Sequence, residues 1–471
     1  MRGRTTGAVA VAAALVLAAS IAVMPSPPRA SAAGRYRVTG ERVAPGLRLL
    51  RIRDSRGPNR IRVLKLNLDS SLTLDMELAN DEIPGHETTS SMAARNGAIA
   101  AINGDYTLLP SDPLQGRPVH MFAQNAELVT SPLLYGRNFA LSHDEQTVYI
   151  GHPKYDAWLT QQETAETWEV AAWNEVPAEF GEFSVYTMTG GWNHKPPLNA
   201  CSARLMPSGA PALRLEQTSV EQSFSVSAVV CRSRRLGRRG GTVISAPWGS
   251  AEGKQIKAGL TVGEQVTLGW TTGWRGVDET IGGNPTLLES GVMTAEDCND
   301  SYFCDRNPRT GIGINANGKI LLVTVDGRQE RSVGMTPVEF ARLFQYLGAT
   351  SALNLDGGGS TTMWARGRVV NRYSGETERP VGSAILVVGE VPEPAPAPTI
   401  SPAPEPTELG TSSADPVASR CDQLRDPAST GGLLDYLAKK NGTNTLFTGQ
   451  LRRALEVYRG ETGCESVRTG N

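Results

Sequence analysis

The fold is decided by one stretch, Lys319–Thr362, which reads KILLVTVDGRQERSVGMTPVEFARLFQYLGATSALNLDGGGSTT. Its apolar run Ile320–Val325 predicts a buried strand. Thr336 is a good N-cap and a proline follows it, so we expect a helix over 337–347, ended by the next glycine. A second apolar run, 352–355, predicts another strand. The stretch therefore predicts a strand–helix–strand unit with a polar, glycine-rich loop after its second strand, a common place for functional groups.

Strands dominate the chain outside this unit. Alternating or apolar runs at 60–68, 72–78, 98–102, 260–270 and 319–325 each predict a strand. Helical periodicity is clear only in the helix named above, whose apolar residues recur at the spacing of one helix face. The sequence thus predicts an α+β (mixed α/β) fold, strand-rich and with few helices, in a single main domain.

The two ends of the chain differ in composition from this domain. Residues 1–32 begin with arginines, continue with an apolar run and end in the small-residue motif Ala30–Ala32, which is typical of a signal peptide. A retained membrane anchor is the alternative. Residues 391–419 are rich in proline and predict a stiff linker, and 420–471 predict a small helical tail. The catalytic or binding domain is expected at 33–390, in a secreted, extracellular protein.

Six cysteines agree with export, because an even number in an exported chain favours disulfides. Their order suggests three local pairs, although free buried thiols and other pairings stay open. The last pair would close the small tail and stabilise it. The pairs are Cys201 with Cys231, Cys298 with Cys304, and Cys421 with Cys464.

Composition excludes several classes of protein. The chain has 471 residues and a formal net charge of -2, so it is not a broadly basic nucleic-acid binder, and no nucleic acid is expected as a partner. The five histidines are scattered, and there is no P-loop, HExxH or GxSxG motif. We therefore expect no metal centre and no required cofactor, while a structural cation such as Ca²⁺ stays open. The frequent Arg, Ala and Gly suggest a GC-rich bacterial gene.

The strongest candidate site is Asp356 with the glycines that follow it. Three consecutive glycines, Gly357, Gly358 and Gly359, expose backbone N–H groups and allow a ligand to approach the main chain. Such a loop, continued by Ser360, suits an anionic oxygen. Asp356 could serve as nucleophile, base or ligand to a sugar hydroxyl, and the alternative is a tight turn in which Asp caps its own backbone.

Other strand ends carry polar residues that could face the same site. Each segment alone has a structural explanation, because Asn-Gly and Asp-Gly are common in turns and Glu378-Arg379 could be a surface ion pair. Arginine among them could form a fork to phosphate or carboxylate. The candidates are Asp326 and Arg328, Arg309 and Thr310, Asn103, Asn284, and Glu378 with Arg379.

Taken together, these segments resemble those of the phosphodiester glycosidase family in their order along the chain and in their residues. The resemblance spans roughly 36–390 and is most specific at 309–388. Two departures concern Asp105-Tyr106-Thr107, where many members have a small residue and two aromatics, and 155–250, which resembles an insertion. The matching segments are Asn103-Gly104, Gly282-Gly283-Asn284-Pro285, Arg309-Thr310, Val325-Asp326-Gly327-Arg328, Leu355-Asp356-Gly357-Gly358-Gly359-Ser360 and Glu378-Arg379-Pro380-Val381.

The resemblance implies a hydrolase that cleaves a sugar-1-phosphodiester bond of the N-acetylglucosamine-1-phosphate type in glycan, wall or capsule material. Asp356 or Asp326 would then lie near the anomeric carbon. A phosphate leaving group needs little acid assistance, so the main tasks are to hold the phosphate and to stabilise an oxocarbenium-like transition state. The residues expected to bind substrate are Asn103, Asn284, Arg309, Thr310, Arg328, Gly357, Gly358, Gly359, Ser360 and Arg379.

Two other functions remain open from the sequence. A non-catalytic protein could bind glycans or cell-wall polymers with the same loops, and the tail after the linker could attach it to the wall. A phosphodiesterase or phosphatase could hold a metal between Asp326 and Asp356, although the chain lacks paired histidines and a denser aspartate cluster. The product of the reaction would separate these functions.

Overall fold

The structure is a computed structural model that describes residues 35–389, except 69–70, 113, 133–135, 176–180, 191–198, 214–215, 233–240 and 297–300. The chain divides into two compact units, Met1–Glu393 and Pro394–Asn471. The predicted signal peptide, the tail at 420–471 and its Cys421–Cys464 pair lie outside the described residues, as does the linker at 391–419. The domain boundaries drawn from the sequence stay predictions. No helix in the described part is long and apolar enough to cross a membrane.

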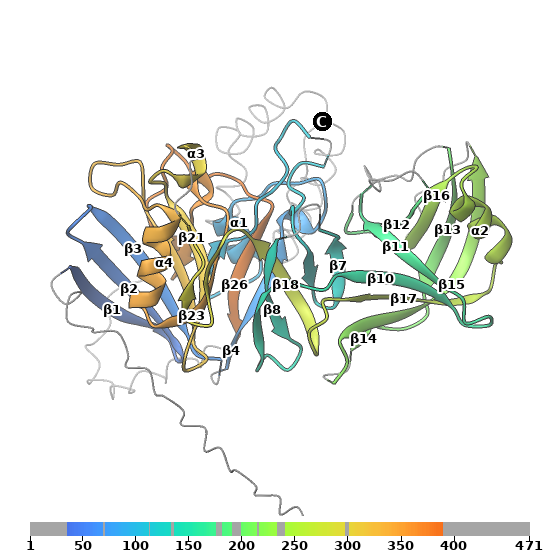
Figure 1. Cartoon of the computed structure of the whole chain (residues 1–471), viewed down its shortest axis with the longest axis horizontal. Coiled ribbons are helices and arrows are strands. Elements are labelled where there is room, and N and C mark those ends of the chain that lie inside the picture. The colour runs from blue at the N-terminus through green and yellow to red at the C-terminus, as the bar shows by residue number, and fades with distance from the viewer. Residues whose placement is uncertain are drawn as a thin grey trace, which may run out of the picture. The chain divides into compact units, whose positions relative to one another are not determined.

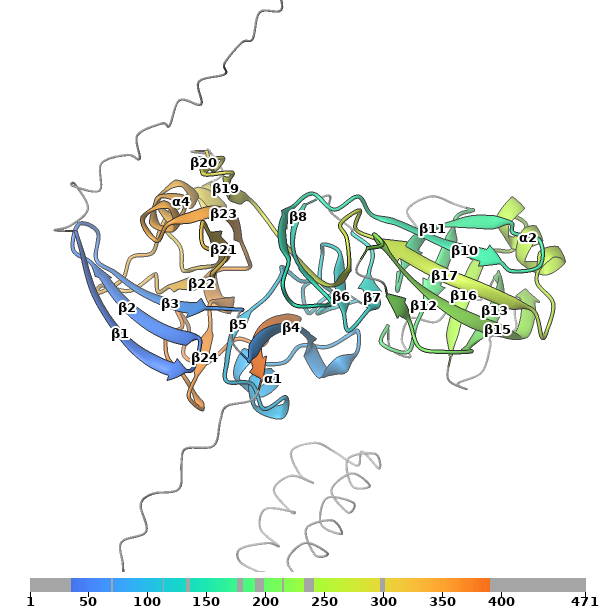
Figure 2. The same ribbon diagram turned by 90° about the horizontal axis from the view of Figure 1, so that it is seen from below.

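The largest assembly of strands around the predicted unit is an eight-stranded sheet, called here the α4 sheet (Figures 1 and 2). In spatial order its strands are β1 (Tyr36–Ala44), β2 (Leu47–Asp54), β3 (Asn59–Leu66), β22 (Ile320–Val325), β21 (Arg309–Asn315), β23 (Ala349–Asn354), β19 (Thr286–Glu289) and β20 (Val292–Met293).

The predicted strand–helix–strand unit is present as β22, α4 (Pro337–Tyr346) and β23. Thr336 and Glu339 form a reciprocal capping box at the start of α4, and Gly348 follows its end with a φ of 82°. Both β22 and β23 pair antiparallel with β21, which lies between them. The two strands of the unit are therefore parallel and one strand apart, and both lead towards the same end of the sheet.

Two five-stranded sheets pack with the α4 sheet around a shared apolar core. Leu64 and Ile312 enter this core from the α4 sheet, Ile385 from the second sheet and Phe139 from the third. The β5 sheet contains β25 (Arg368–Val369), β24 (Met363–Ala365), β5 (Ala100–Asn103), β26 (Ser383–Gly389) and β4 (Leu72–Leu78). The β18 sheet contains β7 (Glu127–Thr130), β6 (Phe122–Gln124), β18 (Val277–Gly283), β8 (Arg137–Ser142) and β9 (Val148–Gly151).

A fourth sheet, the β15 sheet, has a core of its own. The described residues of 155–250 fold into it together with the strand β17 that follows, and whether 155–250 is an insertion stays a prediction. Its strands are β13 (Ala200–Pro207), β16 (Thr242–Pro247), β12 (Phe183–Tyr186), β11 (Thr167–Trp173), β10 (Asp156–Gln161), β17 (Gln265–Thr271), β15 (Ser219–Arg232) and β14 (Ala212–Leu213). The remaining helices are α1 (Thr89–Arg95), α2 (Ala251–Gly259), α3 (Ser301–Cys304) and the 3-10 turns η2 (Ala79–Asp81) and η3 (Gly358–Ser360).

The structure shows one of the three predicted cysteine pairs and one cysteine of a second pair as disulfide-bonded. Cys201 and Cys231 face each other across β13 and β15 and are bonded. Cys304 is also disulfide-bonded, while its predicted partner Cys298 lies outside the described residues. The prediction of oxidised cysteines is thus confirmed for the first pair.

The predicted strands are all present, with boundaries that differ by up to five residues, and the largest difference is at 260–264. Residues 260–264 do not begin the strand expected at 260–270, because Leu260 ends α2 and Gly263 adopts a φ of 97° in the turn that follows. Strand β17 starts only at Gln265. The alternating pattern was therefore correct for the strand itself but extended through a helix end and a turn. With strands in the majority, the strand-rich part of the fold prediction is confirmed for the described domain.

Candidate active site

Asp356 lies just beyond the end of β23, where the chain turns into η3. Its carboxylate accepts a short hydrogen bond from the Ser360 hydroxyl, and its Oδ2 lies 3.4 Å from Nη2 of Arg379. The Asp356 side chain is 18% exposed, so solvent and substrate can reach it. Burial raises the pKa of Asp356 to about 6, against the opposing effects of Ser360 and Arg379. A carboxyl that titrates near neutrality suits acid–base or nucleophilic work.

Two guanidinium groups lie against the glycine loop. A Cβ added to Gly358 would lie 3.3 Å from Nη2 of Arg328, and one added to Gly359 would lie 3.1 Å from Nη1 of Arg379. Gly358 also has a φ of 60°, which disfavours larger residues. Arg328 donates to the side-chain oxygen of Asn307 at 2.9 and 3.1 Å. The glycines therefore allow two cations to approach the main chain beside Asp356, which suits an anionic group of the substrate.

Asn103 lies beneath this loop and is fully buried. It donates to the backbone oxygen of Asp356 at 2.7 Å, and its own oxygen accepts from the Thr310 hydroxyl at 2.8 Å and from the Thr362 N–H at 3.1 Å. The Asp356 N–H in turn donates to the carbonyl of Gly104 at 3.1 Å. Asn103 and Thr310 thus position the loop, which is a different task from the substrate contact predicted for them.

Arg379 is held in place through its neighbour Glu378. The Glu378 carboxylate accepts hydrogen bonds from the N–H and the hydroxyl of Ser90, at 2.9 and 2.5 Å, in the first turn of α1. This is the favourable end of a helix for a carboxylate. Val381 forms two backbone hydrogen bonds with Glu87. The segment that carries Arg379 is therefore fixed on both sides, and Glu378 is not the surface ion pair considered from the sequence.

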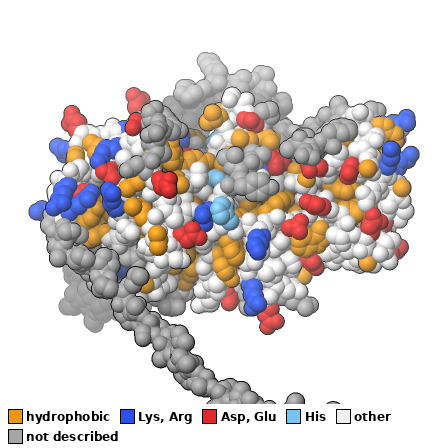
Figure 3. Space-filling model, viewed as in Figure 1, with side chains coloured by type: hydrophobic (Ala, Val, Ile, Leu, Met, Phe, Trp, Pro, Cys, Tyr) orange, Lys and Arg blue, Asp and Glu red, His pale blue; other side chains and the backbone are white. Residues whose placement is uncertain are grey.

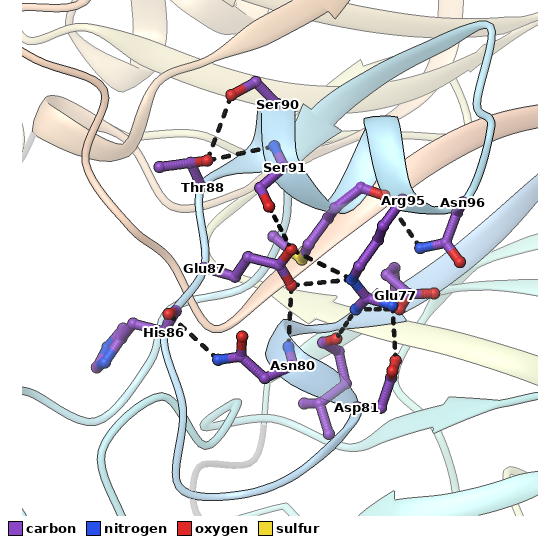
Figure 4. Close-up of polar contacts among 12 residues, drawn as sticks. Glu77, Asn80, Asp81, His86, Glu87, Thr88, Ser90, Ser91, Arg95 and Asn96 are labelled. Atoms are coloured by element: carbon purple, nitrogen blue, oxygen red, sulfur yellow. Dashed lines mark hydrogen bonds and ion pairs between the residues drawn. The ribbon is translucent and has the colours of Figure 1, made fainter. Parts of the chain in front are cut away.

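The region around Glu87 and α1 is itself cross-linked (Figure 4). Arg95, in the last turn of α1, forms ion pairs with Glu77 at 2.5 Å, Asp81 at 2.8 Å and Glu87 at 3.0 Å. Three carboxylates converging on one guanidinium form a network rather than an isolated surface pair. Through Glu87, this network supports the segment that places Arg379 beside Asp356.

We expect Arg379→Gln to raise the pKa of Asp356, because the positive charge of Arg379 lowers it in the native protein. If the ionised carboxylate is the active form, the acid limb of kcat/KM moves from about pH 6 to higher pH in the variant. The free energy of unfolding also depends on the protonation of Asp356. Because burial raises its pKa, the folded state binds the proton more tightly than the unfolded state does. The stability that this bound proton contributes is lost as the pH rises through about 6.

Rates measured between pH 4 and pH 9 test this expectation. The control is Arg366→Gln, which removes an exposed arginine whose ion-pair partner is Glu41. An unchanged pH profile in Arg379→Gln, with a normal profile in the control, would separate Arg379 from the titrating group.

A histidine–aspartate pair lies close to this loop. Asp105 and His120 are both buried, and Nδ1 of His120 lies 2.7 Å from Oδ1 of Asp105. The same carboxylate accepts the N–H groups of His120 and Tyr106. A Cβ on Gly282 would lie 2.0 Å from the Cβ of His120, so the glycine is required for this approach. A carboxylate at Nδ1 fixes the orientation of the ring, and Nε2 lies against Gly136, where an added Cβ would be 2.3 Å away.

Tyr106 connects this pair to Asp356. The rings of Tyr106 and His120 are 6.3 Å apart, and the Tyr106 hydroxyl donates to the carbonyl of Asn284 at 2.9 Å and accepts from Asn354 at 2.8 Å. Burial and the nearby Asp356 raise the pKa of the Tyr106 hydroxyl, so it stays neutral. Asn284, predicted to bind sugar, is exposed at this edge and contributes its backbone oxygen.

His120→Asn should lower kcat/KM by about 100-fold or more, the usual size of a general-base contribution. Asn retains a donor at the position of Nδ1, which preserves the bond to Asp105, and it removes Nε2. The paired variant, His120→Gln, keeps a polar atom near Nε2 and loses the bond to Asp105. Steady-state rates and melting temperatures are compared for both. If both variants melt early and keep activity per folded molecule, the pair is only structural.

Arg309 and Asp326 do not lie with Asp356 in the way the sequence predicted. Arg309 is 2% exposed and donates to the carbonyls of Met335, Phe303 and Asp305 at 2.6–2.9 Å. Its guanidinium stacks over the Phe303 ring at 5.0 Å. Burial lowers the pKa of Arg309 to about 10. These contacts favour a role in holding loops over the role of phosphate clamp.

Asp326 is 1% exposed and lies under the segment that follows β25. Its Oδ1 accepts the N–H of Arg372 at 3.0 Å, and its backbone oxygen accepts the Ser332 hydroxyl at 2.6 Å. Burial raises the pKa of Asp326, although nearby Arg62 opposes the shift. The structure brings together Asp356, Gly357, Gly358, Gly359, Ser360, Arg328 and Arg379, with Asn103, Thr310 and Asn284 around them. Asp326 is buried and bonds Arg372 and Ser332, and no bond joins it to Asp356 among the described residues.

Among the residues that the structure describes, no three His, Cys, Asp or Glu side chains are grouped so that they could hold a metal ion. A cavity of about 350 Å³ lies in the β15 sheet, lined by Trp173, Phe224 and Trp270 among others, and none of the predicted site residues lines it.

Residues 232–388 match the profile of the phosphodiester glycosidase family. This confirms, over that part of the chain, the resemblance seen in the sequence to a family named for its glycosidases, which are hydrolases. The match includes the loop of Asp356 and both arginines beside it. It ends with the last strand of the β5 sheet, β26.

One relative is similar in sequence, and one solved structure is similar in fold. A SPbeta prophage-derived uncharacterized protein of Bacillus subtilis (strain 168), YomE, is 37% identical over 82 residues, which are 17% of this chain and 13% of the relative. A hypothetical protein from Synechocystis has a TM-score of 0.58 at 22% identity, over 75% of this chain and 64% of its own. This chain therefore covers less than two thirds of the length of either relative.

Two further solved structures are similar. A provisionally named exported protein of Burkholderia pseudomallei K96243 has a TM-score of 0.54 at 22% identity, over 70% of this chain and 74% of its own. The catalytic domain of zebrafish N-acetylglucosamine-1-phosphodiester alpha-N-acetylglucosaminidase, auto-inhibited by its pro-peptide, has a TM-score of 0.39 at 14% identity, over 76% of this chain and 89% of its own.

Proposed function

We propose that the domain is a secreted glycosidase that hydrolyses a sugar-1-phosphodiester bond of the N-acetylglucosamine-1-phosphate type. The observation that carries this proposal is the arrangement around Asp356. Its carboxyl has a pKa of about 6 and contacts Ser360 and Arg379. The glycines that follow it leave room for the guanidinium groups of Arg328 and Arg379. A disulfide between Cys201 and Cys231 supports an extracellular location. Glycan, wall or capsule material is the substrate class.

The charges of the site residues suggest which task each one performs in the proposed reaction. Arg379 and Arg328, with the N–H groups of the glycine loop, hold the phosphodiester and stabilise the negative charge that develops on the leaving phosphate. Asp356, ionised above pH 6, lies near the anomeric carbon and stabilises the positive charge that develops there. Because phosphate leaves readily, no strong general acid is needed at the bond that breaks.

A water molecule supplies the hydroxyl of the released sugar. Its oxygen bonds to the anomeric carbon, the bond from that carbon to the phosphate oxygen breaks, and the electron pair of this bond stays on the phosphate. Nε2 of His120, oriented by Asp105, takes the proton of the water. No cofactor enters this scheme.

Product analysis in ¹⁸O-labelled water tests the proposal. With a UDP-sugar or a simple sugar-1-phosphodiester, we expect free reducing sugar that carries the label, and unlabelled phosphate left on the other product. The same result is expected in the presence of a chelator. Label in the phosphate would indicate attack at phosphorus and a phosphodiesterase, and loss of activity on chelation would indicate a metal. Tight binding without turnover would indicate a glycan-binding protein.

A further inference from the structure

Five arginines, none of which contacts the loop of Asp356 in any described hydrogen bond or ion pair, gather on one face of β1, β2 and β3. Arg37, Arg53 and Arg60 are direct cross-strand neighbours in one row, and Arg51 and Arg62 are neighbours in the next. With Thr39 they line a hollow of about 260 Å³. We call these five residues the arginine face. Figure 2 shows the three strands side by side at one edge, and Figure 3, viewed with α4 in front, shows that basic side chains are also present on the other side of this end of the domain.

The arginine face is unfavourable for the folded protein alone. Like charges directly opposite each other on neighbouring strands destabilise a sheet. Arg51 has Glu41 as a partner at 2.6 Å, but no described carboxylate lies within ion-pair distance of Arg37, Arg53 or Arg60. Burial lowers the pKa of Arg62, the nearby Asp326 carboxylate opposes this shift, and the charges of the neighbouring arginines add to it. A bound anion would remove this repulsion, so the face has the properties of a binding site that is complete only with its ligand.

The geometry of the face suits a repeated phosphate rather than a single one. Neighbouring strands are about 5 Å apart, and successive residues on one face of a strand are about 7 Å apart. The three guanidinium groups of the first row can therefore hold one phosphate, and Arg51 and Arg62 lie within reach of the next one along a chain. Arg51 already pairs with Glu41, and Arg62 already donates to the carbonyls of Val370 and Ile61. None of the residues that line the hollow is aromatic, so it offers no surface on which nucleic-acid bases could stack.

The arginine face also borders the elements that reach the candidate site. The carbonyl of Arg60 accepts the N–H of Asp326 at 3.0 Å, and the loop that begins there carries Arg328 to Gly358. Nε of Arg62 donates to the carbonyl of Val370 at 3.0 Å. A polymer held on the face would thus lie beside the loop that supplies a cation to the cleavage site.

We propose that the arginine face binds a phosphodiester-linked glycan or polyol polymer, outside the cleavage site. This proposal rests on the proposed function, because it makes the polymer an extended form of the same substrate class. The net charge of -2 for the whole chain makes a general attraction to polyanions a poor explanation, so binding should depend on these five residues.

The test measures binding of poly(glycerol phosphate) by the full chain carrying Asp356→Asn, at two salt concentrations. We expect the added pair Arg53→Gln and Arg60→Gln to weaken binding at least tenfold and to reduce its salt dependence. The matched control is Arg42→Gln with Arg48→Gln, a cross-strand arginine pair on the opposite face of the same sheet. Its expected effect is less than threefold. Equal losses in both double variants, or equal binding of polyglutamate, would overturn the proposal.

Single-stranded DNA is a second probe, and tighter binding of DNA than of poly(glycerol phosphate) would also overturn the proposal. A readout without ligand is the melting temperature, which should stay the same or rise in Arg53→Gln/Arg60→Gln because repulsion is relieved. A marked fall would show that the arginines stabilise the sheet and would contradict the argument. If the polymer binds through this face while the wild-type chain releases no sugar, the arginine face stands and the proposed hydrolase fails. If sugar is released from small substrates but the polymer does not bind, the reverse holds.

Discussion

Asp356→Asn should lower kcat/KM by at least about 1000-fold, equivalent to roughly 4 kcal/mol of transition-state stabilisation. Asn has nearly the same shape and can keep the hydrogen bond from Ser360, so the melting temperature should change little. The lost property is the negative charge beside the anomeric carbon, which no neighbouring group replaces in this scheme. Steady-state rates on the ¹⁸O-verified substrate, with thermal unfolding of the same samples, check both expectations.

The control for this variant is Asp156→Asn, which removes an exposed carboxylate in β10. Its rate and melting temperature should match the wild type. If Asp356→Asn retains more than a few per cent of activity, Asp356 is not a primary catalytic group. The proposed mechanism would then need another carboxylate, with Asp326 the remaining candidate named from the sequence.

Arg309→Lys should lower the free energy of unfolding by about 2–4 kcal/mol. The guanidinium serves three backbone carbonyls at once, those of Met335, Phe303 and Asp305. A lysine cannot reach all of them with the same geometry, and each buried carbonyl left without a donor costs about 1–3 kcal/mol. Urea unfolding measures this loss. Activity per folded molecule should fall far less than in Asp356→Asn.

A nearby arginine provides the matched control for this change. Arg306 is 44% exposed and forms an ion pair with Glu339, so Arg306→Lys should change stability by well under 1 kcal/mol. The opposite pattern for Arg309→Lys, normal stability with impaired hydrolysis, would restore the phosphate-clamp role expected from the sequence.

Local signals in the sequence were sufficient for the central unit. The Thr336 cap, the proline after it and the glycine at the end define α4, and the apolar runs define its two strands. The alternation of side chains along β21 also indicates which face of the sheet carries Arg309. Arg309 lies on the same face as Gly311, whose added Cβ would be 2.9 Å from the Phe340 ring, while Ile312 faces the opposite core. Strand periodicity therefore places Arg309 on the helix side.

The histidine–aspartate pair could not be predicted in this way. Asp105 and His120 lie fifteen residues apart along the chain, at no spacing that places two side chains together in a helix or strand. Their contact depends on the β18 sheet, where Gly282 leaves room for the imidazole ring. Likewise, the partner of Glu378 is Ser90, 288 residues away. Contacts of this kind arise from tertiary packing, which local patterns do not encode.

The side chain of Asn103 has a consequence for how the protein moves. Because it joins β5 to the backbone of Asp356 and to Thr310 in the neighbouring sheet, the backbone of Asp356 cannot move away without breaking bonds to both sheets. Hydrogen exchange at the amides of Asp356 and Thr362 should accordingly be as slow as at the core strands and occur mainly through global unfolding. Substrate of any length must therefore adapt to a rigid acidic centre, and adjustment to different sugars falls to the outer segments around it.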